Sequence, residues 1–328
     1  MEFTVDCPQS GPLQCDRGVL HKHALTNLGM STNRTPDEPL LSPHLLAQLE
    51  RLELVTRKMF RGQMKGERRS RRKGQSVEFA DFRNYVPGDD LRFIDWNLYA
   101  RLEKLFLKIF MEEEDLHFYA LFDASGSMDF GEPSKFYYAR QLAAALGFVG
   151  LCRADRVKVE ALGASRQFPC LALRGRHNLP RLLEYLDNVE ANQNASLEKS
   201  IKDFCLRNTG KGILVLITDL MDKNGYESAL RLLVAQQMDV FVIHLLSPDE
   251  MDPDVAGDLR LVDCEDADVA EVTISRPLLE RYRRTLASFI QQAREFCTRR
   301  GMVYVATTPA HPVEDLLSNY LRQRGLVR

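Results

Sequence analysis

A carboxylate and two hydroxyl groups occur at alternate positions directly after an apolar run of this sequence. The run at 117–122 leads into the stretch DASGS, which supplies Asp123, Ser125 and Ser127. Carboxylate and hydroxyl oxygens, without histidine or cysteine, are the ligands that a hard cation such as Mg²⁺ prefers. The spacing therefore indicates a site for Mg²⁺, or for another divalent cation such as Mn²⁺ or Ca²⁺.

A second carboxylate stands in the corresponding place after a later apolar run. Asp219 directly follows the run at 212–218. If the two runs are neighbouring strands, Asp219 and the DASGS residues meet at one sheet edge, where ligands of open α/β sheets collect. Clustered carboxylates raise one another's pKa unless a cation lies among them, which favours a metal site. The alternative is that DASGS only begins a helix, because Asp and Ser are also common capping and turn residues.

Strand-like and helix-like segments alternate along the second part of the chain. Further apolar runs lie at 156–162, 239–246 and 302–307, with helical segments at 134–152, 177–187, 197–208, 225–237, 277–300 and 311–323. This order predicts an α/β fold with a mostly parallel sheet covered by helices on both faces. The domain prediction has three parts: a poorly ordered leader at 1–42, an N-terminal helix (43–60), basic segment and small β-rich module at 43–114, and the α/β domain at 115–328.

The composition is that of a soluble globular protein without a membrane span. Of the 328 residues, 45% are hydrophobic and 27% charged, and the formal net charge is −2. The longest nearly apolar run, at 142–152, is much shorter than the ~20 residues that a transmembrane helix needs. The seven cysteines form no CxxC pair, which favours reduced thiols. Since the N-terminus has no secretory signal, we expect a cytoplasmic protein.

The DASGS stretch and the later TDLMD stretch resemble the metal-ion-dependent adhesion site of von Willebrand factor A domains. In that family the two serines bind the cation directly, and a threonine and an aspartate from two further loops complete the site. The resemblance implies a von Willebrand A-like, Rossmann-like sheet whose ion is held by Asp123, Ser125, Ser127 and Asp219. The second loop, NQNASLEKSI, departs from the family pattern, because Ala195 takes the threonine position. Either Ser196 supplies the hydroxyl through a shifted register, or the site is weakened.

A longer stretch, at 69–116, is similar to the hallmark block of the bacterial domain-of-unknown-function family 58. It carries Glu78-Phe79, Arg83-x-Tyr85, the turn VPGDD, Asp95-Trp96 and Ala100-Arg101. The charged residues are expected to form ion pairs around the turn, with Trp96 as a packing anchor. Family members join this block to a von Willebrand A-like domain and look like partners of MoxR-type AAA+ ATPases. The resemblance therefore implies a part in the assembly or activation of other proteins.

These features predict a non-enzymatic, divalent-metal-dependent protein-interaction module that works with a MoxR-type AAA+ ATPase and its client. One alternative is a hydrolase or phosphoryl-transfer enzyme that uses the Asp123/Ser125/Ser127 loop, although ASGSM lacks the Gly-x-Ser-x-Gly elbow of serine hydrolases. Another is nucleic-acid binding by the basic segment at 61–74, which has seven Lys/Arg against one acid but no interleaved aromatic residue. The acidic stretch at 249–271, with ten acids and one arginine, is expected to be a solvated insertion.

Overall fold

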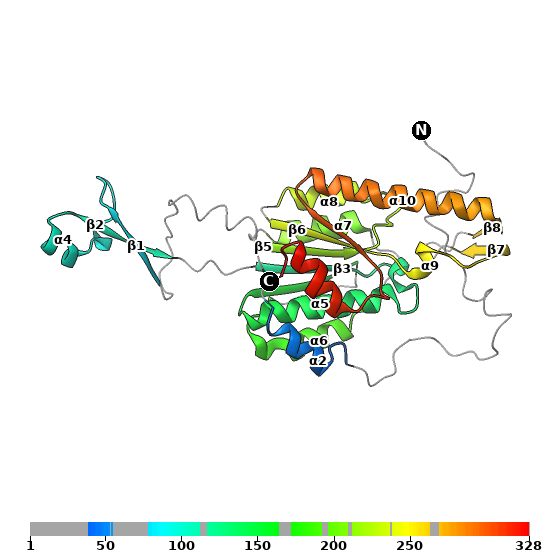
Figure 1. Cartoon of the computed structure of the whole chain (residues 1–328), viewed down its shortest axis with the longest axis horizontal. Coiled ribbons are helices and arrows are strands. Elements are labelled where there is room, and N and C mark those ends of the chain that lie inside the picture. The colour runs from blue at the N-terminus through cyan, green and yellow to red at the C-terminus, as the bar shows by residue number, and fades with distance from the viewer. Residues whose placement is uncertain are drawn as a thin grey trace. The chain divides into compact units, whose positions relative to one another are not determined.

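The computed structural model describes residues 39–52, 54, 78–111, 117–163, 172–191, 196–208, 212–236, 238–262 and 269–327 (Figure 1). The chain divides into two compact units, a small one at 62–115 and a larger one formed by 1–61 and 116–328. The basic segment at 61–74 and most of the predicted leader, residues 1–38, lie outside the described residues.

The larger unit is built on a five-stranded parallel sheet. Its strands are β3 (His117–Asp123), β4 (Arg156–Leu162), β5 (Gly212–Thr218), β6 (Met238–Leu245) and β9 (Val303–Thr307). All five coincide with predicted apolar runs to within one or two residues. The runs are continuous rather than alternating because both faces of a parallel sheet are buried.

Helices cover both faces of this sheet (Figure 1). One core contains Phe118, Ala120 and Phe122 of β3, and is closed by residues of α2 (Pro43–Leu49), α5 (Lys135–Cys152), α6 (Leu179–Asp187) and α11 (Val313–Asp315). The intervening residues, Tyr119 and Leu121, point into a second core with residues of α7 (Leu197–Arg207), α8 (Glu227–Val234) and α10 (Arg276–Arg299). The predicted mostly parallel, Rossmann-like α/β architecture with helices on both faces is therefore confirmed.

The candidate residues lie at the point in the sheet where the order of the strands reverses. The sheet runs β4-β3-β5-β6-β9. The chain thus passes from β3 to β4 on one side and then crosses to β5 on the other side of β3. The carboxyl ends of β3 and β5 flank this topological switch point, which is where open α/β sheets bind ligands.

Two smaller elements follow β6. The short helix α9 (Pro248–Met251) begins at Ser247, and an antiparallel hairpin of β7 (Gly257–Val262) and β8 (Val269–Ile274) precedes α10. The acidic stretch predicted as a solvated insertion thus includes a helical turn and a hairpin, while residues 263–268 lie outside the described part. Every helix among the described residues is too short or too polar to cross a lipid bilayer.

The smaller unit pairs β1 (Glu78–Asn84) with β2 (Phe106–Met111) antiparallel, and α4 (Trp96–Leu102) lies between them in sequence. Two of the ion pairs expected around VPGDD are present: Arg83 makes two hydrogen bonds of 2.8 and 2.7 Å to Asp89, and Arg92 pairs with Asp90 at 2.6 Å. Asp95, expected to join them, instead pairs with Lys108 of β2 at 3.0 Å. The expectation for Trp96 was wrong. Its side chain is 61% exposed on α4 and contacts the ring of Tyr99.

The segment before the smaller unit belongs to the core of the larger one. Pro43 begins α2, whose first turn is capped by the Ser42 hydroxyl accepting from the Leu45 N–H at 3.1 Å. Leu40 and Leu41, predicted as poorly ordered leader, are buried with α2 in the first core. The helix predicted at 43–60 ends at Leu49, and residues 55–60 lie outside the described part. Because of these contacts, α2 belongs to the same compact unit as the sheet and not to the unit that contains the β-rich module.

Candidate functional site

The ends of β3 and β5 are joined by a hydrogen bond between side chains. The hydroxyl of Thr218, the last residue of β5, donates to Asp123 Oδ2 at 2.8 Å. The other carboxylate oxygen, Oδ1, accepts from the Ser125 N–H at 2.9 Å, which fixes the turn after β3. Sequence reasoning missed Thr218, although its position beside Asp219 at the end of an apolar run could have indicated it.

The two serines of DASGS lie side by side next to the second aspartate. Ser125 Oγ and Ser127 Oγ are 3.0 Å apart, and both side chains are buried. The Ser127 side chain is also close enough to Asp219 to contribute to lowering the pKa of that carboxylate. The structure therefore brings together four of the five predicted ligands: Asp123, Ser125, Ser127 and Asp219.

A buried lysine that sequence reasoning did not include completes the cluster. Lys135, the first residue of α5, places its ammonium 2.8 Å from Asp219 Oδ2 and 2.6 Å from Glu250 Oε1. All three side chains are inaccessible to solvent. Glu250 is held in turn by the capping box of α9, in which its Oε2 accepts from the Ser247 N–H at 2.7 Å.

The two aspartates have opposite electrostatic surroundings. Burial raises the pKa of Asp123 to about 6, and the negative charge of Asp219 contributes in the same direction. Burial also disfavours the charged form of Asp219, but the ammonium of Lys135, together with the Met221 N–H, holds the Asp219 pKa below its ordinary value. Asp219 thus has a cationic partner, whereas the hydrogen bonds that Asp123 accepts within the described residues come from neutral donors.

A model of the family described as "Protein of unknown function DUF58" matches residues 81–294. The chain belongs to this family. The match begins within β1 and ends in α10, so it includes most of the β-rich module and the whole cluster at the sheet edge. The family predicted from the hallmark block is therefore confirmed.

Several known proteins are similar to this DUF58 protein. Uncharacterized proteins of Mycobacterium bovis and of Mycobacterium tuberculosis are each 27% identical over 252 residues, which is 75% of this chain and 79% of theirs. Among solved structures, a conserved hypothetical protein BatB from Bacteroides thetaiotaomicron matches 63% of this chain and 98% of its own, with 14% identity and a TM-score of 0.38. A pilus adhesin, SpaC, from Lactobacillus rhamnosus GG matches 66% of this chain and 32% of its own, with 9% identity and a TM-score of 0.41.

The donor set of the DUF58 protein fits a hard divalent cation. Fully ionised, the three carboxylates and one ammonium of the cluster (Asp123, Asp219, Glu250 and Lys135) carry two negative charges that a divalent ion would balance. In the described part of the chain, no three histidine, cysteine or acidic side chains are grouped as metal ligands. Binding at this edge would therefore depend on the serine hydroxyls as well as on the aspartates.

The fifth predicted ligand, Ser196, takes a different part in the structure. It is the N-cap of α7, and its hydroxyl accepts from the Lys199 N–H at 3.5 Å. The next N–H, that of Leu197, donates to Asp222 Oδ2 at 2.7 Å, so the start of α7 contacts the loop that follows Asp219. Ala195 lies outside the described residues.

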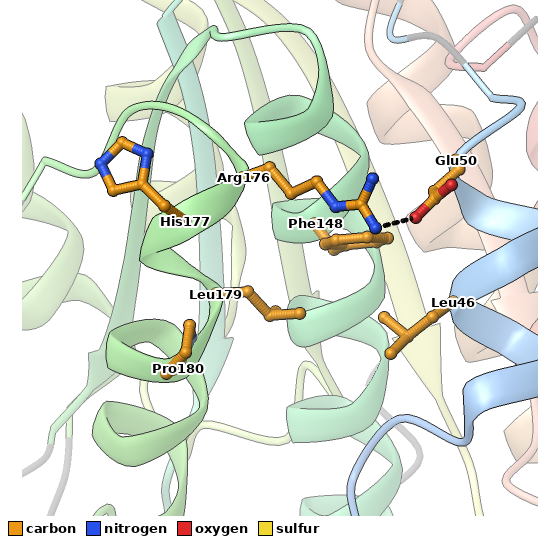
Figure 2. Close-up of a pocket in the computed structure, with 7 residues that line it drawn as sticks. All are labelled: Leu46, Glu50, Phe148, Arg176, His177, Leu179 and Pro180. Carbon is orange, nitrogen blue, oxygen red and sulfur yellow. Dashed lines mark ion pairs between the residues drawn. The ribbon is translucent and has the colours of Figure 1, made fainter.

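A separate hollow of about 470 Å³ lies between α2, α5 and the segment that begins α6 (Figure 2). Its apolar wall includes Leu46, Phe148 and Leu179, and the Arg176 side chain reaches across to Glu50, with 2.5 Å between the charged groups. None of the predicted site residues lines it. The candidate site is therefore the polar cluster at the sheet edge and not this hollow.

A buried histidine near the cluster makes the stability of the folded protein depend on pH. His244 of β6 is fully buried, its Nδ1 lies 2.6 Å from the Tyr304 hydroxyl, and burial lowers its pKa to about 4. Unfolded histidine takes up a proton near pH 6.5, so between pH 6.5 and 4 the unfolded state binds more protons than the folded one. The contribution of neutral His244 to stability is therefore complete above pH 6.5. As the pH falls from 6.5 to 4, this group lowers the free energy of unfolding by about 3 kcal/mol.

We expect the variant His244→Gln, which keeps an acceptor for the Tyr304 hydroxyl, to show a correspondingly smaller loss of stability between pH 6.5 and 4. Urea unfolding of both proteins at half-unit pH steps measures this difference in slope. Other titrating groups, including Asp123, contribute to both proteins alike and cancel in the comparison. Parallel pH profiles for parent and variant would contradict the role of His244.

Proposed function

We propose that this DUF58 protein is a non-enzymatic, divalent-metal-dependent protein-interaction module with a von Willebrand A-like larger unit. In this proposal it works with a MoxR-type AAA+ ATPase in the assembly or activation of other proteins. The observation that carries the proposal is the meeting of Asp123, Ser125, Ser127 and Asp219 at the switch point of the sheet. The resemblance of the DASGS and TDLMD stretches to the metal-ion-dependent adhesion site supports the same assignment.

The chemistry of the donors favours recognition of an acidic partner. Two of the proposed ligands are neutral hydroxyls, and Asp219 already shares its charge with Lys135. An ion held in this way keeps much of its positive charge. A carboxylate from a partner protein can then complete the octahedral oxygen shell that Mg²⁺ prefers.

The surroundings of the two serines favour binding over nucleophilic catalysis. An activated serine needs a base within hydrogen-bond reach. Ser125 Oγ and Ser127 Oγ lie 3.0 Å apart, and the nearby Asp219 is a weak base because Lys135 helps to hold its pKa below the ordinary value. The buried His244 instead uses its Nδ1 for the Tyr304 hydroxyl. We therefore assign no catalytic residue.

Capture of a purified MoxR-type ATPase on the immobilised protein tests the proposal. Retention is expected to be at least about tenfold greater in millimolar Mg²⁺ than in EDTA, because the ion supplies the contact that a partner carboxylate uses. The control is the double variant Ser125→Ala, Ser127→Ala, which lacks the hydroxyl ligands but leaves any effect of Mg²⁺ on the ATPase itself unchanged. Equal retention by parent and double variant would place the interface elsewhere on the chain.

A further inference from the structure

The ammonium of Lys135 lies beside Asp219, one of the proposed metal ligands. It is 2.8 Å from Asp219 Oδ2 and 2.6 Å from Glu250 Oε1, and the side chain is 0% exposed. A divalent ion bound by the DASGS residues would use the same Asp219 carboxylate, because the charge of Asp219 acts on Asp123 and its pKa responds to Ser127. Asp219 would then be shared between a cation built into the chain and one taken from solution.

Glu250 contacts this arrangement through Lys135, and its negative charge also acts on Asp219. One of its oxygens accepts from the ammonium and the other accepts from the Ser247 N–H at 2.7 Å. Its backbone is fixed as well, because its N–H donates to Ser247 Oγ at 3.1 Å and its carbonyl accepts from the Tyr282 hydroxyl of α10 at 2.6 Å. Glu250 is thus a fixed negative charge that holds one side of the ammonium.

We infer that Lys135 and Glu250 set the affinity of the sheet-edge site for divalent cations. Lys135 competes with the ion for Asp219, and Glu250 draws the ammonium away from that carboxylate. Both are positioning residues, since neither is proposed to touch the ion. The inference rests on the proposed function, because it assigns a control on the metal site that the function uses.

The signs of the two effects follow from the charges. With all groups ionised, the cluster of Asp123, Asp219, Glu250 and Lys135 carries two net negative charges. Loss of the lysine charge leaves three negative charges and frees Asp219, so a divalent ion should bind more tightly. Loss of the glutamate charge leaves one and lets the ammonium pair with Asp219 alone, so the ion should bind more weakly. Attraction between buried charges is only weakly screened, which makes both effects large.

A purely structural role for the same residues gives a different result. If Lys135 and Glu250 only joined α5 to α9, removing either charge would lower stability without moving ion affinity in opposite directions. Calorimetric titration of metal-free protein with MgCl₂ distinguishes the two roles. The variants are Lys135→Met and Glu250→Gln, which keep the approximate length of each side chain. The matched control is Lys158→Met on β4, which removes a lysine whose ammonium contacts Asn208 at the end of α7 and Glu160 of the same strand.

We expect Lys135→Met to bind Mg²⁺ roughly tenfold or more tightly than the parent and Glu250→Gln roughly tenfold or more weakly. Lys158→Met should stay within about twofold of the parent, since its charge is outside the cluster. Circular dichroism and thermal melts in EDTA establish that each variant is folded. If Lys135→Met does not fold, Glu250→Gln decides alone, and unchanged or tighter binding by it overturns the inference.

The outcomes separate this inference from the proposed function. If the parent binds Mg²⁺ and both variants bind it with unchanged affinity, the inference is overturned while the metal site stands. If the parent does not bind Mg²⁺ but Lys135→Met does, the metal dependence of the proposed function fails, and the inference is supported because the ammonium excludes the ion. Absence of binding in all four proteins overturns both.

Discussion

Replacement of Asp219 by asparagine is expected to lower the free energy of unfolding by about 3–5 kcal/mol, because it removes a partner from a buried ammonium. Asp219 Oδ2 lies 2.8 Å from Lys135 Nζ, and neither side chain reaches solvent. Glu250 alone would remain beside the ammonium, and the amide of asparagine cannot replace the lost charge. The loss is therefore that of a broken buried ion pair, which greatly exceeds the effect of an exposed one.

The matched control is Asp123→Asn, at the corresponding end of the neighbouring strand. Burial and the charge of Asp219 raise the Asp123 pKa to about 6, so at pH 7 its ionised form is disfavoured in the folded state. Asparagine removes that charge, and the stability in EDTA should be unchanged or higher. Urea unfolding of parent and both variants in EDTA at pH 7 measures the contrast. Similar losses in the two variants would mean that the ammonium does not distinguish the aspartates.

Phe118→Ala is expected to destabilise the larger unit by about 3–5 kcal/mol, the usual cost of removing a buried aromatic ring from a core. Phe118 lies on β3, between β4 and β5, and is 0% exposed. Its ring belongs to the core that α5 closes, so no solvent can fill the space left by truncation. The cavity and the lost burial both contribute to this cost.

Trp96→Ala removes a larger ring and should change stability by less than about 0.5 kcal/mol, because the side chain of Trp96 is mostly exposed. Urea unfolding followed by far-UV circular dichroism compares the two variants without relying on tryptophan emission. Since Trp96 is the only tryptophan, its fluorescence in the parent gives an independent check: an emission maximum typical of a solvated indole is expected. A large loss of stability in Trp96→Ala would show that this ring is covered in solution.

Most of the fold could be predicted because parallel strands that are buried on both faces appear in the sequence as continuous apolar runs. Continuous apolar runs marked all five strands, and the runs ending at Asp123 and Asp219 proved to be neighbours in the sheet. The module was harder to interpret. Trp96 was expected to be a packing anchor, but α4 belongs to a small unit in which several apolar side chains are exposed: Phe82, Val86, Leu91, Phe93, Trp96, Tyr99 and Leu102.

The part of the site that sequence did not reveal depends on contacts between distant segments. Lys135 and Glu250 are 115 positions apart, and no local spacing relates them. A lysine at the first position of a mostly apolar helix was the available signal. For Ser196 the sequence signal was ambiguous, because a serine before a helix is also a common N-cap, and the N-cap role is the one that the structure describes.

The smaller unit is an insertion into the larger one, and this has a consequence for how a family of such proteins can diversify. Leu54 is bridged to Val327 before the insertion, and β3 resumes the sheet after it. Both sides of the insertion thus belong to the same core, which contains Leu54 as well as residues of β3. A relative could therefore exchange or lengthen the module while inheriting the sheet edge unchanged, so the sequences of the two units are free to evolve at different rates.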